Sequence, residues 1–416
     1  MRRSMGILMA ALAILATTLT PAAAVGDGSE TVRFATYNAS LNRNFEGQLR
    51  AEMAAPGNAQ AGVVAEIIQR TRPDVLLVNE FDFDPDGIAL DGFADNYLAV
   101  AQAQDTEGID YPYRYAAPSN TGIASGFDLN NDGVTDTTPA PFNFAYANDA
   151  FGFGWFPGQF GMAVYSMYPI DADAIRTFQL FLWKDMPGAL LPDDPATPEV
   201  ADWFTEDELA VVRLSSKSHW DVPIEIGNKT VHFLVSHPTP PVFDGPEDRN
   251  GTRNHDEIRF WADYISPGKS GYIYDDEGAY GGLKPGELFV IAGDQNSDPV
   301  DGDSIPGAIQ QLIDHPLVNT KMTPASDGAV EQSGLQGGAN DDHLGDPAFD
   351  TADFSDSAPG NLRADYVLPR KTLQLAAAGV FWPTSEDPLF DLVGTFPFPS
   401  SDHRLVWIDV TVPTAK

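Results

Sequence analysis

The chain of 416 residues contains no cysteine. This absence excludes disulfide bonds, thiolate metal ligands and a thiol nucleophile, so the fold must be stabilised by its core and by bound ions. Basic residues are scarce too, because 24 Lys and Arg stand against 60 Asp and Glu, for a formal net charge of -36. Nucleic-acid binding normally depends on neutralising phosphates with Lys and Arg, so the composition disfavours a nucleic-acid partner.

Long hydrophobic runs are lacking after the first residues of the chain. Two arginines precede an apolar run at residues 5–19, which a stretch of small residues follows. This pattern is typical of a cleaved signal peptide, here residues 1–24, and the run is shorter than the roughly 20 residues that a membrane span needs. We therefore expect a secreted, extracellular protein without a transmembrane segment, with residues 25–416 as a single catalytic domain.

Short segments rich in β-branched or aromatic residues and bounded by turn residues predict β-strands. They are residues 31–37, 74–79, 162–167, 231–236, 288–292, 364–368 and 405–412. Apolar residues at a spacing of three to four predict helices at 61–71, 254–265 and 305–312. Strands mixed with helices predict an α/β sandwich. Long insertions rich in Gly, Pro, Asp and Asn, at about 81–160, 185–212, 272–285 and 323–361, are expected to frame a substrate site.

Polar side chains lie at the ends of the predicted strands. These residues are Asn38, Glu80, His237, Asp294, Asn296, Asp365, Asp402 and His403. Carboxylate oxygens suit Mg²⁺ or a similar ion, and such an ion draws charge from phosphoryl oxygens. A histidine can move a proton near neutral pH, and an asparagine can orient a water or a phosphate oxygen without changing its charge. The set therefore favours hydrolysis of a phosphate ester.

The same residues, in the same order, resemble the motifs of the endonuclease/exonuclease/phosphatase superfamily, which contains DNase I. The matching segments are Asn38 at the end of the first strand, Glu80, the strand at 161–166, Ser236-His237-Pro238, Gly293-Asp294-Gln295-Asn296, Asp365-Tyr366 and Ser401-Asp402-His403. The resemblance runs from about residue 31 to residue 412. On these motifs the chain is identified as a secreted, bacterial-type member of that superfamily.

The resemblance implies a DNase I-like fold, a four-layered α/β sandwich of two packed, mainly antiparallel sheets flanked by helices. It implies that Glu80 binds Mg²⁺, Mn²⁺ or Ca²⁺, with Asn38 and Asp402 close by. His237 and His403 become the acid-base and phosphate-stabilising pair. Asp294 would orient or activate the attacking water, Asn296 would bind the scissile phosphate and Asp365 would support a histidine. The division of roles between Asp294 and the two histidines stays open.

A second metal site is predicted in the first insertion. Oxygen-bearing side chains stand at positions one, three, five and nine of a loop, as Asp128, Asn130, Asp132 and Asp136, with Gly133 at position six. This is the pattern of a calcium loop. Position twelve is a proline instead of the usual glutamate, and the flanks are not helical, so we expect a structural Ca²⁺ site at 128–136 without the EF-hand helix pair.

The sequence therefore predicts a secreted, metal-dependent phosphoesterase. We expect a phosphate monoester or diester as substrate, small or lipid-like, attacked by water with the help of the metal. The alternatives are an extracellular, DNase-like nuclease, a sphingomyelinase-like phospholipase whose aromatic residues at 142–160 touch a membrane, and a non-catalytic calcium-binding surface protein. Arg249, Arg253 and Arg259 stand out in so acidic a chain as candidate phosphate contacts.

Overall fold

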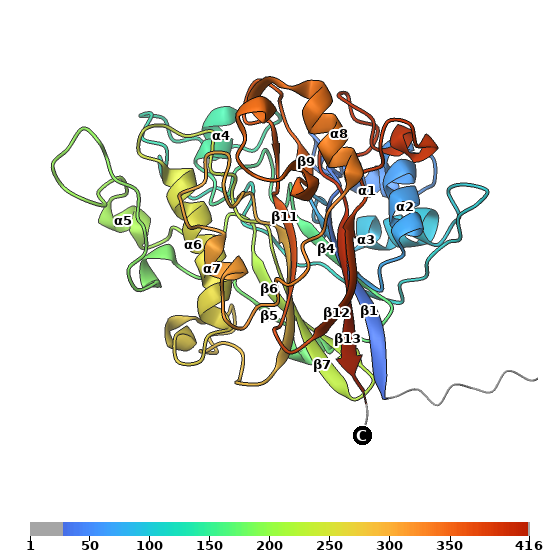
Figure 1. The fold of residues 1–416 in the computed structure, drawn as a ribbon. Helices are drawn as coiled ribbons and strands as arrows, with labels where there is room; N and C mark the ends of the chain where they lie inside the picture. Colours follow the sequence, from blue (N-terminus) through green and yellow to red (C-terminus); the bar gives the residue numbers. More distant parts are fainter. Residues whose placement is uncertain (1–27, 415–416) are drawn as a thin grey trace, which may run out of the picture.

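Two β-sheets form the centre of the molecule in a computed structural model, which describes residues 28–414 (Figure 1). The first sheet holds, in spatial order, β12 (Gln374–Val380), β13 (Val406–Pro413), β1 (Ser29–Asn38), β2 (Val75–Asn79), β4 (Met162–Ser166) and β3 (Tyr113–Tyr115). The second holds β11 (Asp365–Pro369), β8 (Leu288–Asp294), β7 (Lys229–Ser236), β6 (His219–Ile226) and β5 (Arg176–Thr177). A separate pair joins β9 (Ala352–Asp353) and β10 (Asn361–Leu362). The predicted signal peptide at 1–24 lies outside the described residues.

Helices cover the outer face of each sheet, so the described chain has four layers (Figure 1). Beside the first sheet lie α1 (Gln48–Met53), α2 (Ala59–Thr71) and α3 (Ile88–Phe93), and beside the second lie α6 (Arg249–Tyr264) and α7 (Gln310–Ile313). The insertions add α4 (Phe144–Asn148), α5 (Glu206–Leu209) and α8 (Asp327–Gln336). Single turns of other helix types occur at Ala94–Leu98, Ala172–Ala174, Trp183–Asp185, Ser270–Tyr272, Gly338–Asp342, Pro347–Phe349 and Pro388–Leu392. None of the helices between residues 28 and 414 is long and apolar enough to cross a membrane.

The sheets are mainly antiparallel, as expected for the sandwich. Among the described strands, β1 pairs with β2 and β7 pairs with β8 in parallel, and the other ladders of both sheets are antiparallel. In the parallel pair of each sheet, the carboxyl ends of both strands meet at the same edge. The polar residues that follow β1, β2, β7 and β8 are therefore brought to one end of the sandwich.

All seven predicted strands are present, with ends shifted by up to two residues; the helix predicted at 61–71 lies within α2, and the one predicted at 254–265 ends one residue beyond α6. The prediction of a helix at 305–312 is wrong, because only α7 is helical in this part of the chain. Turns occupy the residues before α7, where Gly307 has a φ of 95° that no right-handed helix contains. Helix α2 begins where Asn58 accepts a hydrogen bond from the backbone N–H of Ala61, as a good N-cap does.

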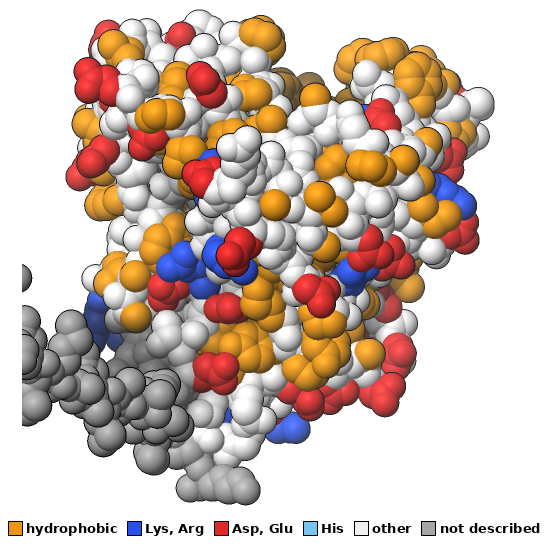
Figure 2. Space-filling model, turned by 90° about the vertical axis from the view of Figure 1, so that its right-hand side faces the viewer, with side chains coloured by type: hydrophobic (Ala, Val, Ile, Leu, Met, Phe, Trp, Pro, Cys, Tyr) orange, Lys and Arg blue, Asp and Glu red, His pale blue; other side chains and the backbone are white. Residues whose placement is uncertain are grey.

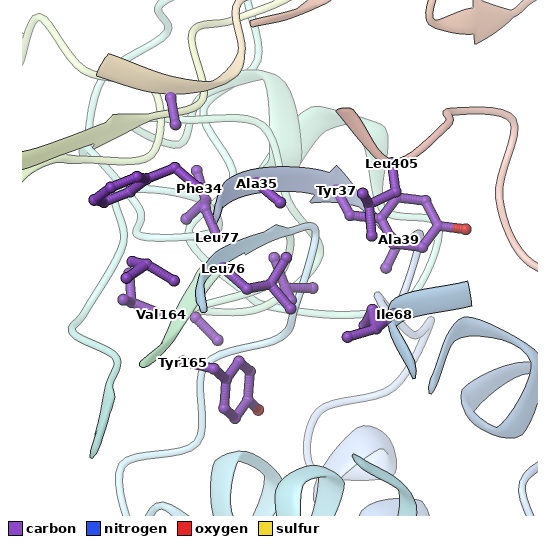
Figure 3. Close-up of a cluster of buried hydrophobic side chains, with 14 of the residues drawn as sticks. Phe34, Ala35, Tyr37, Ala39, Ile68, Leu76, Leu77, Val164, Tyr165 and Leu405 are labelled. Atoms are coloured by element: carbon purple, nitrogen blue, oxygen red, sulfur yellow. The ribbon is translucent and has the colours of Figure 1, made fainter. Parts of the chain in front are cut away.

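The core between the two sheets is built by alternate residues of facing strands. Val32 and Phe34 of β1 are buried, and the ring of Phe34 lies 5.5 Å from that of Phe233 in β7. On the opposite face of β1, Ala35 and Tyr37 belong to the cluster shown in Figure 3, which reaches Ile68 of α2. Strand β1 is therefore buried on both faces, and its position relative to the second sheet is fixed by packing.

A second core lies between the second sheet and α6. Ile258 and Trp261 of α6 pack with Leu234 of β7 and Ile291 of β8. The Trp261 indole N–H also donates to the hydroxyl of Ser236, 3.0 Å away, at the end of β7. Figure 2 shows acidic side chains scattered over one face between larger hydrophobic groups, with fewer basic side chains.

We expect Phe34→Ala to lower the free energy of unfolding by about 3–5 kcal/mol, because it leaves a cavity between the sheets. The measurement is urea unfolding followed by circular dichroism. Phe243→Ala is the matched control, since this phenylalanine is 86% exposed and its loss should change the free energy by at most about 0.5 kcal/mol. Equal effects of the two substitutions would contradict the packing described here.

Candidate active site

The polar residues predicted from the strand ends meet at one edge of the sandwich. Asn38 is opposite Asn79 in the parallel ladder of β1 and β2, so Glu80 follows beside it, and Asp365 is opposite Asp294 in the ladder of β11 and β8. Asn38 donates from Nδ2 to Oδ2 of Asp294 at 3.0 Å, which joins the two sheets directly. The structure thus places side chains more than 250 positions apart in hydrogen-bond contact.

Asp294 lies at the centre of this group and is only 1% exposed. Its Oδ2 lies 3.3 Å from Nε2 of His237 and 3.7 Å from Nε2 of His403. Its Oδ1 accepts the backbone N–H of Asn296 at 2.8 Å. A buried carboxylate is stable only when donors and cations surround it, and Asp294 has both.

His403 bridges two buried aspartates. Its Nδ1 lies 2.8 Å from Oδ2 of Asp365, and the hydroxyl of Thr351 donates to that same oxygen at 2.9 Å. With Nδ1 engaged by Asp365, the other ring nitrogen faces Asp294. Asp365 therefore fixes the orientation of the His403 ring, as the sequence predicted for an aspartate that supports a histidine.

The protonation states of these groups differ. Burial lowers the pKa of His403, but the charges of Asp365 and Asp294 raise it well above its ordinary value. Burial and the charge of Lys217 lower the pKa of His237 to about 4. Burial raises the pKa of Asp294, but the charge of His403 and the contacts with His237 and Asn38 lower it below the ordinary range. Near neutral pH, His403 is thus protonated, His237 is neutral and Asp294 is ionised.

Two further carboxylates, those of Glu80 and Asp402, line the same cavity as Asp294 and His403. Glu80 accepts hydrogen bonds from Nδ2 of Asn38 at 3.3 Å and from Nδ2 of Asn42 at 2.7 Å. Asp402 accepts one from the hydroxyl of Ser40 at 3.4 Å. Burial raises the pKa of Glu80, and the negative charge of Asp402 raises it further. Two like charges near each other, with hard oxygen atoms, are a donor set that a divalent cation stabilises.

The backbone of the site adopts conformations that few residues tolerate. Gly293 has a φ of 147°, and a Cβ atom there would lie 2.0 Å from the carbonyl oxygen of Ser236 in β7. Glu80 and Asn296 both have left-handed backbones, with φ values of 57° and 49°. Such conformations cost of order 1–3 kcal/mol each and persist where the surroundings enforce them. They aim Glu80 and Asn296 into the site.

A cavity of about 1040 Å³ opens from these residues. Glu80, His237, Asp294, Asp402 and His403 line one part of it. Aromatic and aliphatic side chains line much of the rest, namely Leu129, Phe144, Phe151, Phe153, Trp155, Trp183, Phe204 and Val212 from the insertions and the segments beside them. Residues of the insertions at 81–160, 185–212 and 323–361 line the cavity, and none of the insertion at 272–285 does.

Three comparisons with known proteins bear on this geometry. The model of the endonuclease/exonuclease/phosphatase family matches residues 35–403, which is most of the chain. The chain belongs to this family. The members of the endonuclease/exonuclease/phosphatase family are phosphoric ester hydrolases, often dependent on a metal. A search of curated proteins finds no match.

Solved structures with a similar fold include an endonuclease/exonuclease/phosphatase from Beutenbergia cavernae, with 16% identity, a TM-score of 0.46 and coverage of 91% of this chain and 71% of that one. A family protein from Leptotrichia buccalis has 14% identity, a TM-score of 0.45 and coverage of 91% and 99%. Sphingomyelinase C from Streptomyces griseocarneus has 15% identity, a TM-score of 0.41 and coverage of 91% and 99%. Similarity at this level carries no information about the substrate.

Two sets of residues of this family member could hold a metal ion. Among residues 28–414, Asp294, Asp365 and His403 are the three acidic or histidine side chains whose ligand atoms lie within 4.8 Å of one another. In that set, Nδ1 of His403 and Oδ2 of Asp365 are already engaged with each other. Glu80 and Asp402 have weaker partners and face the cavity, so the donor chemistry fits a cation better there.

The side chain of Asn38 is not oriented as a metal ligand, which is the role that the resemblance implied for it. Its amide nitrogen, not its oxygen, faces Glu80 and Asp294, and its Oδ1 accepts the backbone N–H of Ser40 at 3.3 Å. In this orientation Asn38 positions the two carboxylates. Its oxygen would face a cation near Glu80 only after the amide group turned over.

The predicted calcium loop forms a turn with hydrogen bonds of its own. Asp128 accepts the backbone N–H groups of Asp132 and Gly133, and Nδ2 of Asn130 donates to Asp132 at 3.1 Å. Asp136 instead accepts hydrogen bonds from Thr138 and Asn143. The structural Ca²⁺ site at 128–136 stays a prediction.

The side chains of the candidate arginines already have partners within the protein. Arg249 pairs with Glu247, Arg259 lies 3.1 Å from Asp263, and Arg253 donates to four backbone carbonyl groups. The sequence interpretation missed Thr351, which holds Asp365, and Lys217, which lines the cavity. The signal for Lys217 was slight: a lysine among small polar residues before a strand that was not recognised.

Gly293→Ala is expected to reduce stability and to displace Asp294, because the new methyl group would meet the carbonyl oxygen of Ser236. Gly286→Ala is the matched control, since Gly286 also has a positive φ, 102°, but no atom within 4 Å of a Cβ. The control should lose about 1–3 kcal/mol from backbone strain, and Gly293→Ala should lose more. Thermal unfolding measures both, and equal losses would contradict the close approach of β8 to β7.

Proposed function

We propose that this chain is a metal-dependent phosphoesterase that hydrolyses a phosphate ester carrying an apolar group. One observation carries the proposal: the buried group of Asp294, His237 and His403 opens into the same cavity as Glu80, Asp402 and a wall of aromatic side chains. The family consists of phosphoric ester hydrolases, and the polar part of the cavity has the residue types that such chemistry needs.

A divalent cation would be held by Glu80 and Asp402 and would draw charge from the phosphoryl oxygens. The protein side chains supply the rest. His403, held by Asp365, keeps a proton that it can donate to a phosphoryl oxygen or to the leaving oxygen. Asp294 is ionised and accepts hydrogen bonds, so it orients the attacking water. Nδ1 of His237 is buried without a hydrogen-bond partner in the described residues and can accept one from that water or from the substrate.

The apolar wall favours a lipid-like substrate. The rings of Phe144 and Phe153 lie 4.9 Å and 5.1 Å from that of Trp155, and both phenylalanines are exposed. Exposed aromatic clusters of this kind commonly mark binding surfaces. A small, fully polar phosphate ester would leave this part of the cavity unused.

A nuclease is the second candidate, because bases can stack on exposed phenylalanine and tryptophan rings. The charge opposes it: the arginines at the cavity, Arg249 and Arg253, are engaged by Glu247 and by backbone carbonyls. A polyanion normally needs several free Lys and Arg side chains for its phosphates.

The export expected from residues 1–24 stays a prediction.

His403→Gln is expected to lower kcat by about 10²- to 10⁴-fold, the usual contribution of an acid-base histidine. The matched control is His232→Gln, because Nδ1 of His232 forms a similar, partly buried pair with Asp221 at 2.7 Å, outside the cavity. The control should keep the wild-type kcat, whatever it does to the melting temperature. The assay uses a panel of phosphate monoesters and diesters, with Mg²⁺ and with EDTA. Equal kcat values for the two variants, or undiminished turnover in EDTA, would contradict the mechanism.

The substrate is tested with methyl and octyl p-nitrophenyl phosphate, two diesters with the same leaving group. Each buried methylene stabilises a complex by about 0.8 kcal/mol, so the octyl ester should have a kcat/KM at least about tenfold higher. Phe153→Ala should reduce this ratio and leave the methyl ester unchanged. Phe396→Ala is the control, since Phe396 is 85% exposed and lies outside the cavity.

Nicking of supercoiled plasmid is measured beside the two esters. If the octyl and methyl esters had nearly equal kcat/KM values and the plasmid were nicked rapidly, the substrate would be a nucleic acid and not a lipid-like ester. Hydrolysis of no ester and no plasmid would overturn the phosphoesterase proposal and leave the non-catalytic calcium-binding protein.

A further inference from the structure

Lys217 is a lysine buried at the wall of the active-site cavity. It lies in the segment just before β6, is 6% exposed, and lines the cavity together with Glu80, His237 and Asp294. Buried lysines are rare unless their charge is paired, because removing an ammonium group from water costs several kcal/mol. Its position therefore calls for a specific reason.

The backbone around Lys217 is held firmly. The N–H of Asn120 donates to the carbonyl oxygen of Lys217 at 2.8 Å, and the Asn120 side chain donates to the carbonyl of Ser215 at 2.8 Å. Gly152 packs so closely on Ser216 that a Cβ atom at position 152 would lie 1.9 Å from the carbonyl oxygen of Ser216. The long first insertion thus fixes the segment that carries Lys217.

The ammonium group of Lys217 has no hydrogen bond or ion pair with any residue in 28–414. The nearby carboxylate of Glu257 is occupied, since its oxygens accept the backbone N–H groups of Ser216 and Thr239, each at 2.7 Å. The two arginines of the cavity, Arg249 and Arg253, are engaged by Glu247 and by backbone carbonyls. Three N–H donors of Lys217 are thus left for a ligand.

The charge of Lys217 acts on the reacting groups. Burial lowers the pKa of Lys217 below its ordinary value, and the carboxylates of Glu257, Glu80 and Asp294 offset only part of that shift. The ammonium group is therefore within electrostatic range of the carboxylates of Glu80 and Asp294. A group placed between Lys217 and a cation at Glu80 and Asp402 would feel positive charge from two sides, which suits a phosphoryl group whose oxygens gain charge during hydrolysis.

We propose that Lys217 binds a non-bridging oxygen of the substrate's phosphate group and is a further catalytic residue of this site. This inference rests on the proposed function, because it assigns the ligand to the same cavity. The step is binding and charge stabilisation alone, and no covalent bond forms at Lys217.

The test is calorimetric titration of the full chain with inorganic phosphate, with Mg²⁺ and again with EDTA. Lys217→Met should weaken phosphate binding at least tenfold under both conditions, and Lys217→Gln should do the same. Lys217→Arg should recover part of the affinity. The exposed Lys284, remote from the cavity, provides the control Lys284→Met, which should bind phosphate as the wild type does.

Melting temperature separates this role from a structural one. Lys217→Met should melt at or above the wild-type temperature, because it removes an unpaired buried charge. Arg253→Met should melt lower, because it leaves four carbonyl groups without their donor. A large drop in the melting temperature of both the Met and Gln variants of Lys217 would show a structural cation and overturn the proposal.

The remaining outcomes distinguish the two proposals. Unchanged phosphate affinity and unchanged kcat/KM in Lys217→Met, in an enzyme that hydrolyses esters, would overturn the role of Lys217 and leave the phosphoesterase intact. Loss of phosphate binding in Lys217→Met, in a protein that hydrolyses no ester, would support the anion site and overturn the catalytic function. A wild-type protein that binds no phosphate in either condition would overturn the role of Lys217.

Discussion

The ionised carboxylate of Asp294, buried between the two sheets, is the interaction on which the rest of the site depends. A buried charge is stable only when donors and cations surround it, and its partners come from distant parts of the chain: Asn38 from β1, His237 after β7 and His403 before β13. Each partner has a required position, so the two sheets cannot slide relative to each other without exposing Asp294 or leaving it unpaired. The charge of Asp294 also raises the pKa of His403, so stability and chemistry rest on one group.

The strand ends were predictable because they depend on local properties. A run of β-branched residues followed by an acidic or amide residue is visible in the sequence, and parallel pairing brings such ends together. The missed elements depend on tertiary contacts. Strand β6 contains Pro223, which argues against a strand, but Pro223 lies beyond the short ladder with β5, where no neighbour needs its N–H group. Strand β12 is rich in alanine and is held by its ladder with β13. The helix predicted at 305–312 failed at Gly307, whose backbone conformation no hydrophobic spacing reveals.

The residues of the site were predicted better than their contacts. The side chains expected at the strand ends do meet, because the motifs keep the family's order. The part played by each depends on distances that the sequence does not contain: the amide nitrogen of Asn38 faces Asp294, and Asp365 is held by Thr351, for which no motif exists. Lys217 escaped notice for the same reason. Its importance comes from burial and from the lack of a partner among residues 28–414, and both are properties of the folded chain.

The ladder between β1 and β13 has a consequence for the order of folding. Ser29 pairs with Pro413, so the two ends of the described chain lie side by side, and β1 separates β13 from β2 within the first sheet (Figure 1). During synthesis, β1 therefore has one open edge until β13 has been made, and contacts this distant in sequence form slowly. His403 lies just before β13, so the histidine joins Asp294 only when the last strand is in place. The finished active site is thus a late product of folding, and a chain that stops short of β13 would lack the strand that joins β12 to β1 and that holds the segment of His403 in place.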